Sequence, residues 1–91
     1  MTTLYRRNPA VEGAPLHQET ILFEPGTNRF CMLNGTAAFL WEHLHEPATV
    51  EQLSGEVCRH FAGVDKEVAE VDVRRALEEF RQLSIVEWAP S

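Results

Sequence analysis

Short apolar segments separated by turn residues fill the first third of the chain, and apolar residues recur at helical spacing after residue 35. Thr20–Phe23 is β-branched and aromatic, which predicts a strand, and the apolar segment Arg29–Leu33 predicts a second one. Between them, Glu24–Asn28 is predicted to turn, because proline presets φ at one corner and Gly26 accepts a positive φ at the next. Pro9–His17 contains glycine and proline, so it is predicted to be at best an edge strand or a bent one.

The strand over residues 29–33 leads directly into a helical pattern, so it should be the last strand of its sheet in chain order. Successive side chains of a strand point to opposite faces of the sheet. Arg29, Cys31 and Leu33 should therefore face one way, and Phe30 and Met32 should face the other. The rest of the chain is expected to pack around this strand–helix junction.

Two helices are predicted in the middle of the chain. The first covers about Gly35–Leu44, and a side-chain oxygen of Asn34 or Thr36 is available to cap its first turn. The second begins at Thr49, where the sequence matches a capping box, and it ends at Gly63. Trp41 lies at an apolar position of the first helix and is predicted to be a core residue.

A third helix should run from a cap at Asp65 to about Leu83 and present one apolar face. That face comprises Ala69, Val73, Ala76, Leu77, Phe80 and Leu83. Arg74 and Arg81 lie together on one flank of the helix, beside Leu77. The other flank carries Asp72, Arg75 and Glu79. The sequence leaves open which flank faces the strand over residues 29–33.

The predicted fold class is α+β, in which a three-stranded antiparallel sheet is followed by three helices in a winged-helix-like order. A chain of 91 residues can bury one modest core, and residues 9–88 are predicted to form a single domain. Residues 1–8 are expected to be a flexible polar lead-in, and Ile85–Trp88 to be a short final strand or apolar clamp. No apolar run approaches the roughly 20 residues that span a bilayer. Without a signal segment, the expected location is the cytoplasm, with Cys31 and Cys58 as reduced thiols.

The charge of the chain argues against nucleic acid as a partner. The formal net charge is −6, and affinity for DNA or RNA depends on neutralising phosphates. The sequence contains no glycine-rich phosphate loop, nucleophile motif or metal signature, so no catalytic residue, cofactor or metal site is predicted. The two cysteines and four histidines lack the paired spacing of zinc ligands, so they are interpreted as structural or solvated residues.

The segment Leu33–Trp41, LNGTAAFLW, resembles the "LN-x-T-A-x-x-[IL]-W" core of PqqD-like proteins. Three further segments follow the order of that family. They are an "L-F-x-P-G" hairpin in Ile21–Gly26, a "T-V-E-x-L" helix start in Thr49–Leu53, and "D-V-x-x-x-L-x-x-[FL]" within Asp72–Phe80. The family usually has a glycine near its C-terminus, where this chain has Ser84. The resemblance covers about Val11–Trp88, which is nearly the whole chain.

This family is the pyrroloquinoline-quinone biosynthesis protein D family, also called the RiPP recognition element. The resemblance implies a small non-catalytic module that binds the leader segment of a ribosomally made precursor peptide. It would present the precursor to a modifying enzyme, often a radical SAM maturase. The resemblance also implies that the leader adds as a strand beside the third strand and lies against the third helix. The contact residues expected on this basis are Arg29, Phe30, Cys31, Met32, Leu33, Val73, Arg74, Leu77 and Arg81.

The predicted function is therefore that of a peptide-binding chaperone and not an enzyme. One alternative is a winged-helix DNA-binding transcription regulator, because Pro47–Leu83 contains two helices joined by a short loop. Another is a metal-binding or redox module built on Cys31 and Cys58. Affinity for DNA at moderate salt would favour the regulator, and stoichiometric zinc would favour the metal-binding module.

Overall fold

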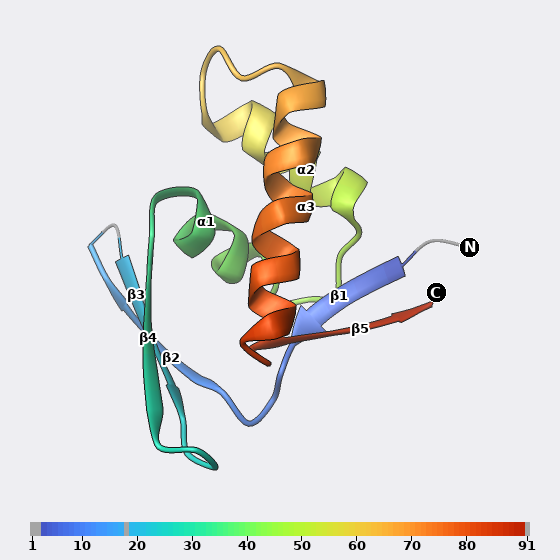
Figure 1. The fold of residues 1–91 in the computed structure, drawn as a ribbon. Coiled ribbons are helices and arrows are strands. Elements are labelled where there is room, and N and C mark those ends of the chain that lie inside the picture. The colour runs from blue at the N-terminus through green and yellow to red at the C-terminus, as the bar shows by residue number, and fades with distance from the viewer. Residues whose placement is uncertain (1–2, 18, 91) are drawn as a thin grey trace.

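A computed structural model describes residues 3–17 and 19–90 of the chain, and the fold is α+β (Figure 1). In chain order the elements are β1 (Thr3–Arg7), β2 (Glu12–Leu16), β3 (Glu19–Glu24), β4 (Arg29–Asn34), α1 (Gly35–His43), α2 (Val50–His60), α3 (Lys66–Gln82) and β5 (Val86–Pro90). Strands β2, β3 and β4 form an antiparallel sheet in that order, and three helices follow it. This confirms the predicted fold class, the edge position of the strand within residues 9–17, and β4 as the last strand of its sheet.

The β3–β4 hairpin pairs Glu24 with Arg29 at its closed end and Glu19 with Asn34 at its open end. The connecting turn is where predicted, but the positive φ is not at Gly26. Asn28 instead adopts the left-handed conformation, with φ of 57°. Asparagine tolerates this conformation better than most residues, because its short polar side chain hydrogen-bonds locally.

The expectation of a flexible lead-in over residues 1–8 is wrong for Thr3–Arg7, which forms β1 and pairs antiparallel with β5. The guanidinium of Arg7 donates two hydrogen bonds to the carbonyl of Trp41, at 3.0 and 2.6 Å, and lies over the indole ring. Tyr5 and Ala48 also exchange two backbone hydrogen bonds, of 2.8 and 2.9 Å. These polar contacts hold β1 against the rest of the fold, although its sequence shows no regular row of apolar residues. Residues 1 and 2 lie outside the described part of the chain.

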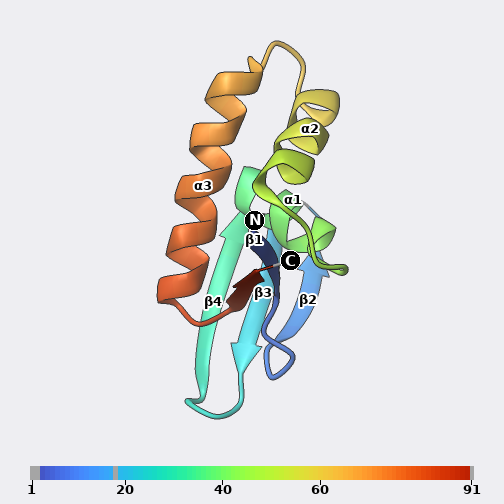
Figure 2. The same ribbon diagram turned by 90° about the vertical axis from the view of Figure 1, so that its right-hand side faces the viewer.

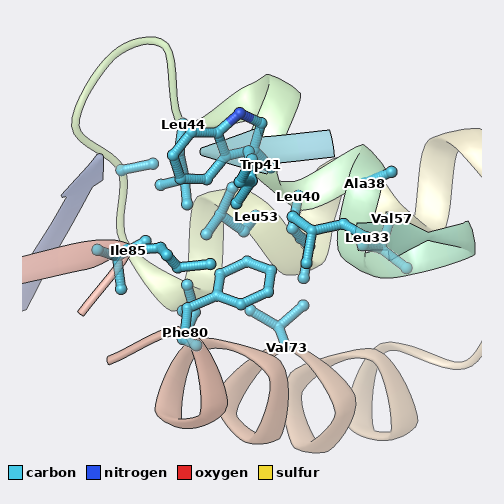
Figure 3. Close-up of a cluster of buried hydrophobic side chains, with 14 of the residues drawn as sticks. Leu33, Ala38, Leu40, Trp41, Leu44, Leu53, Val57, Val73, Phe80 and Ile85 are labelled. Atoms are coloured by element: carbon cyan, nitrogen blue, oxygen red, sulfur yellow. The ribbon is translucent and has the colours of Figure 1, made fainter. Parts of the chain in front are cut away.

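The helices and the β1–β5 ribbon all lie on one side of the β2-β3-β4 sheet (Figures 1 and 2). The core forms there, where side chains of α3 meet those of α1, α2 and β4, as Figure 3 shows around Trp41, Val73 and Phe80. Trp41 is 2% exposed, which confirms its predicted core position. No helix within the described residues is long and apolar enough to cross a membrane.

The predicted helix ends are only partly confirmed. The capping box is present, with the Gln52 N–H donating to Thr49 Oγ1 at 3.1 Å and the Thr49 N–H donating to Gln52 Oε1 at 2.9 Å. Asp65 occupies the N-cap of α3, but its side chain makes no capping hydrogen bond. Thr36 lies inside α1 and not at its cap, and the side chain of Asn34 lies outside what the structure describes.

Ser84 lies at the end of α3 and adopts a conformation that is usual for glycine. Ser84 has φ of 62°, and its N–H donates to the carbonyl of Arg81 at 3.0 Å. The N–H of Ile85 donates to the carbonyl of Phe80, also at 3.0 Å. This pair of bonds is a Schellman motif, in which the left-handed residue is usually glycine. Ser84 therefore holds a conformation that a glycine would adopt at lower cost.

Candidate functional site

One edge of β4 is not paired with any strand of the described residues, so its backbone groups are open to hydrogen bonding. β4 pairs with β3 along one edge, and no strand among the described residues pairs with its other edge. The opposite edge of the sheet belongs to β2, which carries Pro15, a residue that cannot donate to a further strand. Arg29–Leu33 contains no proline, so the backbone groups on the free side of β4 form a template for an added strand.

The side chains of β4 alternate as predicted. Leu33 is 5% exposed and Cys31 is partly buried, so this row faces the core and the helices. Phe30 and Met32 are 71% and 58% exposed on the outer side of the sheet. The backbone of Arg29–Leu33 thus lies at the free edge, whereas only the inward-facing row can contact a ligand held between β4 and α3.

A pocket of about 160 Å³ lies where the end of α3 approaches the first residues of β4. Its apolar lining comprises Val11, Leu22, Phe30, Cys31, Leu83 and Ile85. Arg29 and Glu24 stand at the same pocket with their charged groups 4.0 Å apart. The pocket is therefore an apolar hollow beside an open strand edge, and it suits an aliphatic side chain of a peptide bound along that edge.

Figures 1 and 2 place α3 beyond the β4 edge of the sheet, with the β1–β5 ribbon on the other side of the helix. Arg81 faces that ribbon, because its guanidinium lies 5.7 Å from the ring centre of Trp88. It also donates to the carboxylate of Glu78 at 2.8 Å, and this hydrogen bond lowers the pKa of Glu78. Arg74 precedes Arg81 by seven residues, two helical turns, so it lies on the same flank.

This arrangement favours the other flank of α3 as the one toward β4. It does not support the expected wall of Arg74 and Arg81 opposite β4, which stays a prediction. Leu83, on the opposite flank, contributes to the pocket beside β4. Val73 and Leu77 have no exposed surface, so they support the helix from the core and do not reach a ligand. The predicted apolar face of α3 is confirmed for Ala69, Val73, Leu77 and Phe80, whereas Ala76 is partly buried and Leu83 is exposed. The pattern did not say which side of this face meets the sheet edge.

Leu83 is a candidate site residue that the sequence analysis assigned only to the apolar face of the third helix. It lies at the limit of the predicted apolar face of α3 and is 38% exposed, because it is the C-cap residue and the core ends there. The available signal was that Leu83 is an apolar residue at the border of the predicted apolar face. It also directly precedes Ser84, where the family usually has glycine. The turn at Ser84 fixes where Leu83 points.

The two cysteines are free thiols, and both are partly buried. Within the described ranges, no three histidine, cysteine, aspartate or glutamate side chains are close enough to hold a metal ion. A larger pocket of about 410 Å³ lies between the start of β3 and helices α1 and α2. Phe39 and His60 line it, and their rings stack with the ring centres 4.5 Å apart. The sequence reasoning did not identify this pocket.

Comparison with known proteins gives a match to one protein family and to solved structures of the same fold. Residues 19–86 match the family described as "Coenzyme PQQ synthesis protein D (PqqD)". "TbiB1 in Complex with the TbiA(beta) Leader Peptide" is 23% identical, with a TM-score of 0.83 over 90% of this chain and 94% of that chain. "Lasso peptide synthetase B1 complexed with the leader peptide" is 17% identical, with a TM-score of 0.76 over 91% and 96%. No curated protein matches the chain.

Proposed function

Because this chain belongs to the PqqD family, we propose that it binds the leader segment of a ribosomally made precursor peptide and presents it to a modifying enzyme. The two similar structures are complexes with leader peptides, and they share the fold of this chain. In this proposal the chain is a binding partner and not a catalyst. It acts in the cytoplasm, a reducing compartment that suits the free thiols of Cys31 and Cys58.

The observation that carries the proposal is the unpaired edge of β4 beside α3 and the small apolar pocket. An extended leader would exchange main-chain hydrogen bonds with Arg29–Leu33, which gives affinity independent of side chains. Its side chains would point alternately to the two faces of the extended sheet. One row would face α3 and the pocket that contains Cys31 and Leu83, and this row would supply specificity.

A proline scan of β4 tests strand addition directly. Adjacent residues of a strand direct their N–H groups to opposite edges, so only one of Cys31→Pro and Met32→Pro removes a donor from the free edge. That variant should keep the circular dichroism of the parent and weaken leader binding by about tenfold or more, since several hydrogen bonds of the added strand depend on its register. The other variant should disturb the β3–β4 pairing and lower the melting temperature.

The probe is a fluorescently labelled synthetic leader of a precursor peptide, to be sought as a short reading frame near the gene for this chain. The readout is fluorescence anisotropy. A leader with the same composition in scrambled order is the control. Unchanged affinity in the folded proline variant would exclude strand addition at β4. Equal affinity for the scrambled peptide would exclude specific leader recognition altogether.

No observation favours the alternative of a DNA-binding regulator. The net charge is −6, and two basic side chains of α3, which would be the recognition helix, lie within reach of acidic ones. They are Arg75 beside Asp72 and Arg81 beside Glu78. Basic side chains that are already paired with carboxylates neutralise few phosphates, so this surface should bind a nucleic-acid backbone weakly.

A further inference from the structure

The face of the β2-β3-β4 sheet that points away from the helices is apolar. We call it the outer sheet face, and its apolar residues are Ala14, Leu16, Ile21, Phe23, Phe30 and Met32. Phe23 pairs with Phe30, with ring centres 4.6 Å apart, and Ile21 pairs with Met32 on one side and Ala14 on the other. Leu16 at its margin is 47% exposed. These side chains form contiguous rows across three strands.

None of the described helices or strands covers this face, since all of them lie on the other side of the sheet (Figures 1 and 2). An antiparallel sheet with one solvated face normally carries polar residues there. Contiguous exposed apolar residues on a small protein are instead typical of an interaction surface. The leader groove does not account for this surface, because it uses the edge of β4 and the inward-facing row.

The charged residues beside the outer sheet face are both acidic. Glu12 pairs with Phe23, and Glu19 pairs with Leu16, so both carboxylates share the face with the apolar rows. The whole chain also carries a net charge of −6. Two copies packed through this face would bring acidic groups together, which disfavours self-association. The complementary occupant is a different protein with an apolar surface bordered by lysine or arginine.

The outer sheet face is also continuous with the edge at which the leader is proposed to add. A leader strand beside β4 would extend the sheet, and alternate leader side chains would stand in line with Phe30 and Met32 on the outer face. A protein docked on this face would then contact both the chain and its bound leader. Its affinity would therefore rise when the leader is present.

We propose that the outer sheet face docks the modifying enzyme through an apolar surface bordered by basic residues, and that the bound leader strengthens this contact. Both the identity of the partner and the strengthening rest on the function proposed above, whereas the exposed apolar face is an observation independent of it. By linkage, the enzyme must raise the affinity for the leader by the same factor that the leader raises the affinity for the enzyme.

The test uses the enzyme encoded beside the precursor whose leader serves as the probe, with affinities from biolayer interferometry with and without saturating leader. Ile21→Lys places a cation in the middle of the outer sheet face. Val71→Lys, at a position on α3 that is 55% exposed, is the matched control. Leader at saturation should raise the affinity of the parent for the enzyme about fivefold or more. Ile21→Lys should weaken enzyme binding about tenfold or more, and Val71→Lys less than about twofold.

A second pair of variants covers the case in which Ile21→Lys does not fold. Glu12→Lys with Glu19→Lys reverses the charges of the face at exposed positions. Glu51→Lys with Glu67→Lys makes the same change of net charge on exposed helical positions away from the sheet. Only the first pair should weaken enzyme binding, and the loss should shrink as salt is added.

Equal enzyme affinity for Ile21→Lys and Val71→Lys overturns the docking proposal. A dimer of the parent in analytical ultracentrifugation that Ile21→Lys dissociates also overturns it, since the face would then join two copies. Leader binding without enzyme is measured separately, so its absence counts against the proposed function alone. In that case the comparison of Ile21→Lys with Val71→Lys, made without leader, still decides whether the face docks the enzyme.

Discussion

Leu83→Ala should weaken leader binding by an amount set by the part of the Leu83 side chain that is exposed in the free chain. The substitution removes three carbon atoms, and complete burial of three such groups contributes about 2.4 kcal/mol at ~0.8 kcal/mol each. Leu83 is 38% exposed in the free chain, so a bound leader can newly bury at most about two fifths of the residue's total surface. The expected loss is about 1 kcal/mol of binding free energy, or about fivefold in Kd.

Fluorescence anisotropy with the labelled leader resolves a fivefold change, and urea denaturation of the same samples reports the stability of the fold. Val71→Ala is the matched control, because Val71 is an exposed apolar residue of the same helix on the side away from the pocket. The control should leave Kd within about twofold of the parent. If Leu83→Ala and Val71→Ala bind the leader equally well, the leader does not cover the pocket beside β4.

Three further predictions concern the scaffold. Leu77→Ala should lower the free energy of unfolding by about 2–5 kcal/mol in urea denaturation, because Leu77 is fully buried, and a loss below about 1 kcal/mol would contradict that packing. Ser84→Gly should raise it by up to about 1 kcal/mol, because glycine adopts the positive φ more readily, and a decrease would argue against the Schellman motif. The hydrogen bond from Arg81 lowers the pKa of Glu78 in the folded chain. The pair therefore stabilises the fold at pH values above the pKa of Glu78 in the unfolded chain, and this contribution is lost as the pH falls through the pKa of Glu78 in the folded chain. Arg81→Gln should return the NMR titration midpoint of Glu78 to its ordinary range, and an unchanged midpoint would refute the assigned cause.

The sequence predicted the elements whose signals are local. The alternation along Arg29–Leu33 gave the inward and outward rows of β4 correctly, because a strand has only two faces. The capping box at Thr49 and the buried position of Trp41 were also predicted, since each depends on residues within one helical turn. The order of strands and helices followed from these local signals and the short connections between them.

Features that depend on tertiary contacts were not predictable in the same way. The pairing of Thr3–Arg7 with β5 joins the two ends of the described chain, and its stabilising contact, the Arg7 guanidinium on Trp41, has no local signature. The sequence also could not predict how α3 is rotated relative to β4, because the apolar face of α3 is bordered by a polar flank on each side. The structure places Arg81 beside Trp88 and gives Leu83 and Cys31 a shared pocket, which favours the flank that carries Leu83.

The central claim is that a leader peptide becomes a fourth strand of the β2-β3-β4 sheet at the free edge of β4. Amide hydrogen exchange by NMR on the labelled chain, with and without leader, tests it most directly. The account predicts that alternate amides within Arg29–Leu33 become protected on leader binding and show cross-strand nuclear Overhauser effects to the leader backbone. Binding that leaves all five of these amides exchanging as in the free chain, with shifts confined to other elements, would contradict it.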